Sequence, residues 1–217
     1  MEKYSPLPDK RRIGLIGGTF DPIHYAHLAI AEEVRTALDL TEMVFIPAGE
    51  PPHKIGHTLT AIDDRLAMLQ LAIASNPHFT YSRVEIDRSG PSYLVDTLRI
   101  LHAEWGTDIN LYFVIGWDSL EELHHWHDPL GILEQLTHLV VVKRPGHSVD
   151  IEYNKQLELR LPGIMQRLLV TSAPQLAISS TDLRRRVAEE RSIKYLLPET
   201  VERYIYEHGL YHPVHRR

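Results

Sequence analysis

The chain has 217 residues, 43% of them hydrophobic and 24% charged, with no cysteine and a formal net charge of -6. The absence of cysteine excludes disulfides, thiolate catalysis and cysteine-ligated metal sites, and the negative balance argues against a broad nucleic-acid-binding face, which is normally basic. No apolar run approaches the ~18 residues of a membrane span, so we expect a soluble, cytoplasmic protein. Residues 1–11 are expected to form a loose N-terminal leader, and residues 12–217 a single domain.

Strands and helices are predicted to alternate over most of the chain. Short apolar runs typical of buried strands occupy residues 12–18, 42–48, 79–86, 109–116 and 138–146. Apolar residues at helical spacing lie between them, at residues 26–40, 61–75 and 93–106. This alternation predicts an α/β fold, a Rossmann-like doubly wound parallel sheet. Further on, residues 168–174 read as a short strand, and residues 179–190 and 197–210 as C-terminal helices.

The segment GGTFDPIHYAHL, residues 17–28, joins the first predicted strand to the first helix. Gly17 and Gly18 allow a tight turn and a close approach of the backbone to a ligand, and the N-terminus of the following helix favours an anion. The glycine spacing fits neither the dinucleotide-binding nor the P-loop pattern. His24 and His27 can project to one side of the helix. The residues alone leave phosphate binding, metal binding and simple packing open.

A second segment, ISSTDLRRR, covers residues 178–186. Ser179 and Asp182 fit a helix-capping box, and a run of arginines is typical of a solvated face. Successive helical residues point ~100° apart, so only one of the three arginines can easily face a site.

Both segments resemble signatures of the adenylyl- and cytidylyltransferases. Residues 17–27 are similar to G-[GS]-[TS]-F-[DN]-P-x-H-x-G-H, with Ala26 where that family usually has glycine, and residues 178–184 match I-S-[SA]-T-x-[IL]-R. The resemblance implies that His24, His27 and Arg184 are catalytic, with Arg184 gripping the β- and γ-phosphates of ATP. The ATP-binding residues that it implies are Gly17, Gly18, Thr19, Phe20, His24, His27, Gly116, Asp118, Arg144, Ile178, Ser179, Ser180, Thr181 and Arg184.

The acceptor is indicated by further short segments in order along the chain: PPHK at residues 51–54, GPSYLVDTL at 90–98, IGWDSL at 115–120 and KRPG at 143–146. With Trp126 and the C-terminal YLLPETVERYIYEHGLY, they resemble bacterial nicotinate-nucleotide adenylyltransferases over about residues 12–211.

This second resemblance implies a mononucleotide site. Lys54 would lie near the transferring phosphates, Asp118 would contact ribose hydroxyls, and Trp126 would stack on the nicotinate ring. Tyr93 and Leu94 would hold the nicotinate carboxylate. The family often has threonine where this chain has Leu94, so main-chain groups are left for that contact.

The implied reaction is adenylyl transfer from ATP to nicotinate mononucleotide, giving deamido-NAD and pyrophosphate. Mg²⁺ is expected on the triphosphate, with few protein ligands and no dedicated metal site. The expected partners are these small molecules, without nucleic acid or membrane, and the sequence is compatible with a homo-oligomer. Two alternatives remain open: another acceptor, such as nicotinamide mononucleotide or phosphopantetheine, and a non-catalytic nucleotide-binding sensor.

Overall fold

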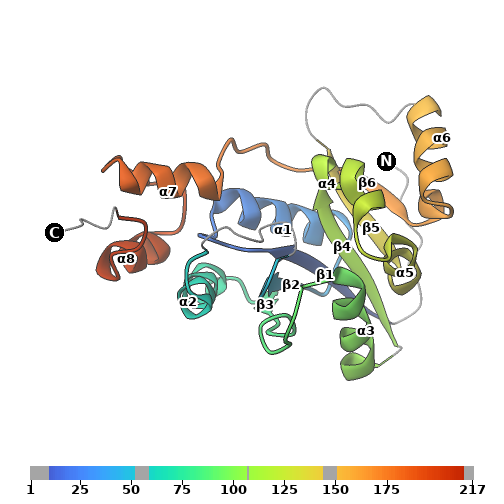
Figure 1. Ribbon diagram of the computed structural model, residues 1–217, viewed down its shortest axis with the longest axis horizontal. Coiled ribbons are helices and arrows are strands. Elements are labelled where there is room, and N and C mark those ends of the chain that lie inside the picture. The colour runs from blue at the N-terminus through green and yellow to red at the C-terminus, as the bar shows by residue number, and fades with distance from the viewer. Residues whose placement is uncertain (1–9, 52–58, 107, 144–150, 213–217) are drawn as a thin grey trace.

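Six parallel strands form the centre of the protein in the order β3-β2-β1-β4-β5-β6. The structure, a computed structural model, describes residues 10–51, 59–106, 108–143 and 151–212 (Figure 1). The strands are β1 (Arg11–Gly18), β2 (Glu42–Pro47), β3 (Phe79–Tyr81), β4 (Ile109–Gly116), β5 (His138–Lys143) and β6 (Leu168–Ser172).

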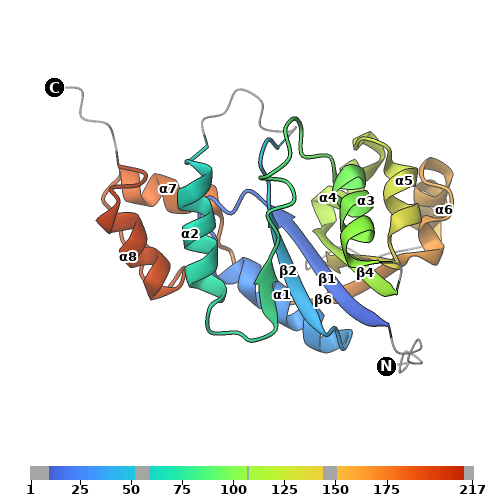
Figure 2. The ribbon, with the colours of Figure 1, turned by 90° about the horizontal axis from the view of Figure 1, so that it is seen from below.

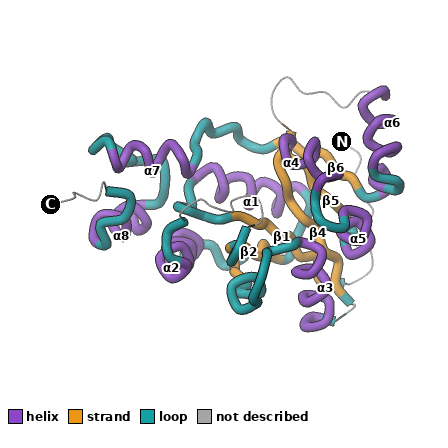
Figure 3. The backbone as a smooth tube through the Cα atoms, viewed as in Figure 1, coloured by secondary structure: helices purple, strands orange, loops and turns teal. Residues whose placement is uncertain are grey.

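Helices connect each strand to the next, as parallel pairing requires, and two further helices follow β6. The connecting helices are α1 (Tyr25–Ala37), α2 (Ile62–Ile73), α3 (Leu94–Trp105), α4 (Trp117–Glu122), η2 (Leu123–His125), α5 (Pro129–Gln135), α6 (Ile151–Arg160) and η3 (Ile164–Gln166), and the helices after β6 are α7 (Ser180–Ala188) and α8 (Glu199–Glu207). Figure 3 shows the strands in the middle of the molecule and the helices around them. None of the helices in the described ranges is long and apolar enough to cross a membrane.

Each face of the sheet carries its own hydrophobic core, because successive strand residues point to opposite faces. On β4, Leu111 and Phe113 pack into the core that α3, α4, α5 and α6 cover. Tyr112 and Val114 pack into the opposite core, which α1, α2, α7 and α8 cover. The sheet is therefore buried on both faces, and the predicted doubly wound α/β architecture is confirmed.

The strand order reverses at β1, and this reversal locates the site. From β1 the chain crosses to β2 on one side of the sheet, whereas from β4 it crosses to β5 on the other. In such sheets, ligands bind beyond the carboxyl ends of the strands at the point where the direction changes. Gly18 and Gly116 are the last residues of β1 and β4, and both lie at this point.

Two segments differ from the expectations of the sequence. The strand expected over residues 79–86 ends at Tyr81, because β3 pairs only with Met43 to Phe45 of β2, and the chain then turns, with the amide of Ile86 donating to the carbonyl of Arg83 at 2.8 Å. Between β5 and β6, where the sequence has no clear pattern, α6 buries Leu157 against the sheet.

The two C-terminal helices lie with α2 at one end of the molecule, away from α3, α5 and α6 (Figures 1 and 2). Tyr204 of α8 donates to a carboxylate oxygen of Asp64 of α2 at 2.9 Å. A loop from β6 leads to α7 and brings that helix next to the start of α1 (Figure 1). The last part of the chain thus returns to the segment that follows β1.

Candidate active site

Two adjoining cavities open at the carboxyl ends of β1 and β4. The larger has a volume of about 890 Å³ and the smaller about 500 Å³. Residues that line both of them are Gly18, Thr19, His27, Ile30, Gly116 and Val142. A ligand can therefore extend from one cavity into the other past the glycine turn and His27.

The space where the cavities meet depends on glycines. A Cβ atom added at Gly116 would meet no atom within 4 Å, so it would project into the open space of the site. At Gly18, an added Cβ would lie 3.0 Å from the ring of Phe20. Phe20 itself is buried and adopts a left-handed backbone conformation with φ of 49°. The glycine turn is therefore closely packed against Phe20 on one side, while the side of the site at Gly116 is open.

His24 and His27 stand together at the start of α1. His24 is the N-cap residue, and the two imidazole rings stack with their centroids 3.8 Å apart. The backbone amide of His24 donates to Nδ1 of His27 at 3.3 Å, and the ring of Phe20 packs edge-on against His27. The acceptor role of Nδ1 leaves Nε2 as the protonated nitrogen of neutral His27, so this ring can donate one hydrogen bond outward.

Both histidines are neutral in the free protein at neutral pH. Burial lowers the pKa of His24 to about 4. Burial, and secondarily the neighbouring His24, also lowers the pKa of His27. Nδ1 of His24 is buried without a hydrogen-bond partner among the described residues. An anion bound beside these rings would favour their protonated forms.

The start of α7 forms the other side of the smaller cavity. Its N-cap is Ser179, whose hydroxyl accepts from the amide of Asp182 at 3.2 Å, as the capping pattern predicts. Ser180 donates to the carbonyl of Pro22 at 2.9 Å, which holds α7 against the loop before α1. Ile178, Ser179, Ser180, Thr181 and Arg184 line the cavity together with His24 and Ala26.

Of the three consecutive arginines, Arg184 reaches the site. Its Nη1 donates to the main-chain carbonyl of Asp21 at 2.7 Å, and Nη2 lies 3.4 Å from the hydroxyl of Thr181. Arg185 and Arg186 turn away and pair with Asp182. The helical geometry thus separates one arginine in the cavity from two that stabilise the helix.

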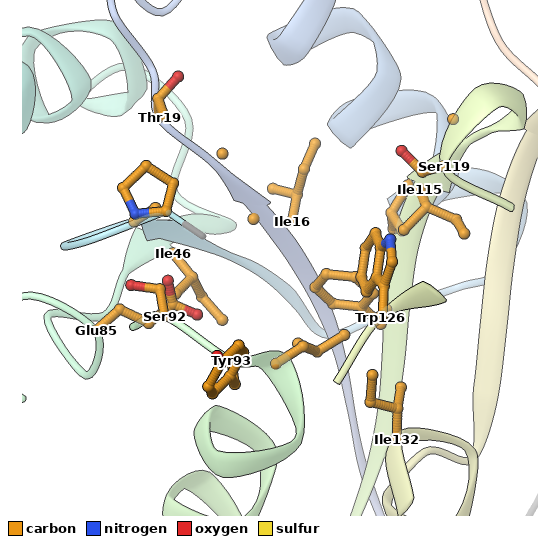
Figure 4. Close-up of a pocket in the computed structure, with 18 of the residues that line it drawn as sticks. Ile16, Thr19, Ile46, Glu85, Ser92, Tyr93, Ile115, Ser119, Trp126 and Ile132 are labelled. Atoms are coloured by element: carbon orange, nitrogen blue, oxygen red, sulfur yellow. The ribbon is translucent and has the colours of Figure 1, made fainter. Parts of the chain in front are cut away.

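The larger cavity has aromatic walls at its far end. Tyr93 precedes the first residue of α3 and stacks on His127, with 4.2 Å between ring centroids. Trp126 lies on the β4 side of this cavity, whereas Glu85 and Ser92 lie on the other side (Figure 4). Such walls fit a flat aromatic ring.

A buried carboxyl group supports this end of the larger cavity. Glu85 is only 7% exposed and accepts from the hydroxyl of Thr97 at 2.8 Å. Burial raises the pKa of Glu85, while the hydrogen bonds from Thr97 and Ser92 act in the opposite direction. The hydroxyl of Ser92 also accepts from the amides of Gly49 and Glu50, at 3.1 and 3.2 Å. These contacts join the end of β2 to the start of α3.

The structure brings most of the residues expected from the sequence to the two cavities, but not all of them. Gly17, Tyr93, Leu94 and Trp126 line the larger cavity. Asp118 is exposed in the first turn of α4 and lines neither cavity, although its neighbour Ser119 lines the larger one. Phe20 lines the smaller cavity. Lys54 and Arg144 lie outside the described residues.

Residues that sequence reasoning missed include Glu85 and Arg65. The sequence did not indicate Glu85 as a site residue, because the segment at residues 79–86 has the pattern of a strand. Arg65, which is 2% exposed, carried a signal: it falls on the apolar side of α2, beside Leu66 and Leu69. A charged residue in an apolar stripe indicates a buried partner.

The described residues contain no group of three or more histidine, aspartate or glutamate side chains placed to hold a metal ion. The polar groups around the smaller cavity are mainly hydrogen-bond donors: Arg184, the hydroxyls and amides at the start of α7, and the histidines. Donors of this kind bind phosphate oxygens.

A parallel doubly wound sheet with helix N-termini, an arginine and two histidines around a glycine turn defines a nucleotide-binding α/β protein. The model of the cytidylyltransferase-like family matches residues 15–186. A "probable nicotinate-nucleotide adenylyltransferase" of Thermomicrobium roseum is 48% identical over 94% of this chain and 92% of its own length. A protein of the same description from Roseiflexus sp. is 50% identical over 92% of this chain and 97% of its own length. The chain therefore belongs to the cytidylyltransferase-like family, in the group of nicotinate-nucleotide adenylyltransferases.

Solved structures share the fold. Nicotinic acid mononucleotide adenylyltransferase of Plasmodium falciparum, complexed with NaAD, superposes with a TM-score of 0.73 at 20% identity. The aligned region covers 93% of this chain and 97% of that one. The same enzyme complexed with APC gives a TM-score of 0.69.

The low pKa of His24 predicts a loss of stability in acid. The unfolded chain binds a proton on this residue below about pH 6.5, whereas the folded protein does so only below about pH 4. Between these values the unfolded state holds more protons, so acidification favours unfolding. In urea unfolding at pH 7 and about pH 4.5, His24→Asn should reduce the pH-dependent change in unfolding free energy by about 2 kcal/mol relative to wild type. The exposed His78 provides the control, His78→Asn, and an equal reduction in both variants would contradict this assignment.

Proposed function

We propose that the protein transfers the adenylyl group of ATP to nicotinate mononucleotide, forming deamido-NAD and releasing pyrophosphate. The observation that carries the proposal is the position of His27, at the junction of a donor-rich cavity and an aromatic-walled cavity. The smaller cavity fits the triphosphate, and the larger fits a mononucleotide with a flat ring. The proposal includes Mg·ATP as the substrate form and a cytoplasmic location, where ATP is available.

In the reaction, an oxygen of the mononucleotide 5′-phosphate attacks the α-phosphorus of ATP in line. The bond from the α-phosphorus to the bridging oxygen breaks, and pyrophosphate leaves with the electron pair. The attacking phosphate is already anionic at neutral pH, so the protein needs no general base. Its contribution is to hold two anions together and to stabilise the charge that develops on the leaving oxygen.

The site supplies that stabilisation with donors fixed before the substrate arrives. Neutral His27 donates from Nε2, and His24 lies beside it to contact the same phosphate region. Arg184 and the first amides of α7 face the departing pyrophosphate across the smaller cavity. Binding of the triphosphate favours protonation of both rings, since it places negative charge beside them. Mg²⁺ enters on the triphosphate and neutralises part of its charge.

The larger cavity recognises the acceptor by stacking and by the start of α3. Trp126 and Tyr93 offer ring faces to the nicotinate. The first amides of α3, at Leu94 and the residues after it, have no acceptor within the helix and favour a carboxylate. Leu94 has no hydroxyl, so the preference for nicotinate over nicotinamide rests on these main-chain groups.

The direct test offers the purified protein ATP, Mg²⁺ and one acceptor at a time: nicotinate mononucleotide, nicotinamide mononucleotide or phosphopantetheine. We expect pyrophosphate release with the highest kcat/KM for nicotinate mononucleotide. A higher value for either of the other acceptors would contradict the assigned substrate. ATP binding without turnover of any acceptor would instead indicate a nucleotide sensor.

Replacement of His27 tests the role of the junction. His27→Asn should lower kcat by about 10²-fold or more, the scale expected when a donor to the transition state is lost. Pyrophosphate release is the readout, and circular dichroism checks folding. His78→Asn, on the surface, serves as the matched control. A folded His27→Asn enzyme with a kcat close to that of wild type would remove this residue from the chemical step.

Replacement of Trp126 tests the acceptor cavity. Trp126→Ala should raise KM for nicotinate mononucleotide by about tenfold, because ring stacking contributes roughly 1–3 kcal/mol. KM for ATP should change little. Trp105 is a partly buried tryptophan that packs against the same core but lines neither cavity, so Trp105→Ala controls for lost packing. Equal effects of the two replacements on KM would rule out stacking at Trp126.

A further inference from the structure

Asp21 lies at the centre of a buried polar network beneath the site. It is 1% exposed and belongs to the segment between the glycine turn and His24. Its main-chain carbonyl accepts from Arg184 at 2.7 Å. Its carboxylate accepts from the amide of Thr60 at 3.2 Å and from the hydroxyl of Tyr211 at 2.7 Å. The residue that holds the cavity arginine is therefore itself held from two other parts of the chain.

Arg65 completes this network from α2. Its Nη1 donates to the carbonyl of Thr19 at 2.8 Å, and Nε donates to the carbonyl of Thr60 at 3.1 Å. Burial lowers the pKa of Arg65, and the nearby Asp21 carboxylate counteracts that effect. The buried acid and the buried base thus offset part of each other's desolvation, and Arg65 links Thr19, in the turn before the histidines, to Thr60, in the segment before α2.

Tyr211 reaches Asp21 because of the way in which α8 ends. Gly209 adopts a left-handed conformation with φ of 60°. The amide of Leu210 donates to the carbonyl of Ile205 at 2.9 Å, and the amide of Gly209 to that of Tyr206 at 3.2 Å. These two hydrogen bonds together form a Schellman motif, which ends the helix and turns the chain away from its axis. Tyr211, also left-handed with φ of 67°, follows and points its phenol into the core beside Met68.

We propose that Tyr211 is a positioning residue for adenylyl transfer: its hydroxyl holds the Asp21 carboxylate, and through Asp21 it orients Arg184 and the turn before His24. This role rests on the proposed function. The residue lies 190 positions from Asp21 in the sequence, so the C-terminal helix becomes part of the support of the active site.

The contacts favour positioning over general packing. The hydroxyl of Tyr211 donates its hydrogen bond to a carboxylate, the stronger kind of hydrogen bond. Burial and the Asp21 charge both raise the pKa of Tyr211 far above that of a free phenol, so the group remains a donor at every working pH. The amide of Thr60 occupies the other carboxylate oxygen. With both carboxylate oxygens held, the Asp21 side chain is fixed, which restricts the movement of the main chain whose carbonyl accepts from Arg184.

The experiment removes only the hydroxyl, in Tyr211→Phe. We expect kcat to fall about tenfold, since small displacements of catalytic groups cost that much or more, while KM for nicotinate mononucleotide stays within about twofold because Tyr211 lines neither cavity. Tyr204→Phe is the matched control. This variant removes a tyrosine–aspartate hydrogen bond of 2.9 Å that joins α8 to α2 and does not involve the turn before His24.

Thermal unfolding of both variants separates stability from position. Similar losses of Tm with a fall in kcat only in Tyr211→Phe would support the proposal. Equal kcat values in the two variants would overturn it, as would a fall in activity expressed wholly as a higher KM for nicotinate mononucleotide. If the wild-type enzyme released no pyrophosphate with any acceptor, the proposed function would fail and this role with it.

A double-mutant cycle with Arg184→Lys gives a second, independent readout. If Tyr211 acts by orienting Arg184, removal of its hydroxyl in the Arg184→Lys background should cost less than about twofold in kcat, because coupled residues are not additive. The same tenfold loss in both backgrounds would mean that Tyr211 does not act through Arg184.

Discussion

The parallel pairing of β1 with β4 is the constraint on which the site depends. The chain leaves β1 over one face of the sheet and β4 over the other, so the crossover helices diverge. Beyond the two carboxyl ends, the space between them stays open, and both cavities form there. Gly116 ends β4 without a side chain that would project into this space, and Gly18 ends β1 where an added Cβ would meet the ring of Phe20. Helices α1, α3 and α7 all begin around it, and each brings the positive end of its dipole.

An acidic protein that binds polyanions must build its positive potential locally. The net charge of the chain is -6, and the smaller cavity counters it with Arg184, helix N-termini and two neutral histidines. Neutral rings avoid the cost of burying charge in the free protein, yet they can donate and can take up protons when phosphates arrive. The buried network of Asp21, Arg65 and Tyr211 contacts Arg184 and the turn before His24 from below the cavity, and we propose that it orients them. The proposed chemistry therefore relies on preorganised donors rather than on a high density of charge.

The sequence predicted the parts of this arrangement that are written in short contiguous segments. The turn at residues 17–28 and the cap at Ser179 follow from local spacing. Helical geometry allows only one of the three arginines to face a site, and the resemblance to the family signature selected Arg184. The strand expected over residues 79–86 was wrong beyond Tyr81, because its length is limited by the pairing available on β2. Helix α6 has too mixed a pattern to be recognised alone. Contacts such as Tyr211 with Asp21 join residues 190 positions apart, and no local pattern encodes them.

The central claim is that two adjoining cavities hold the triphosphate and the mononucleotide at the same time and meet at His27. Calorimetric titration of nicotinate mononucleotide, with and without a saturating non-hydrolysable ATP analogue, tests it most directly. The arrangement predicts one binding site for each ligand and a ternary complex, with the affinity for the mononucleotide unchanged or higher in the presence of the analogue. Mutual displacement, with the apparent Kd of the mononucleotide rising in proportion to the analogue concentration, would contradict the claim.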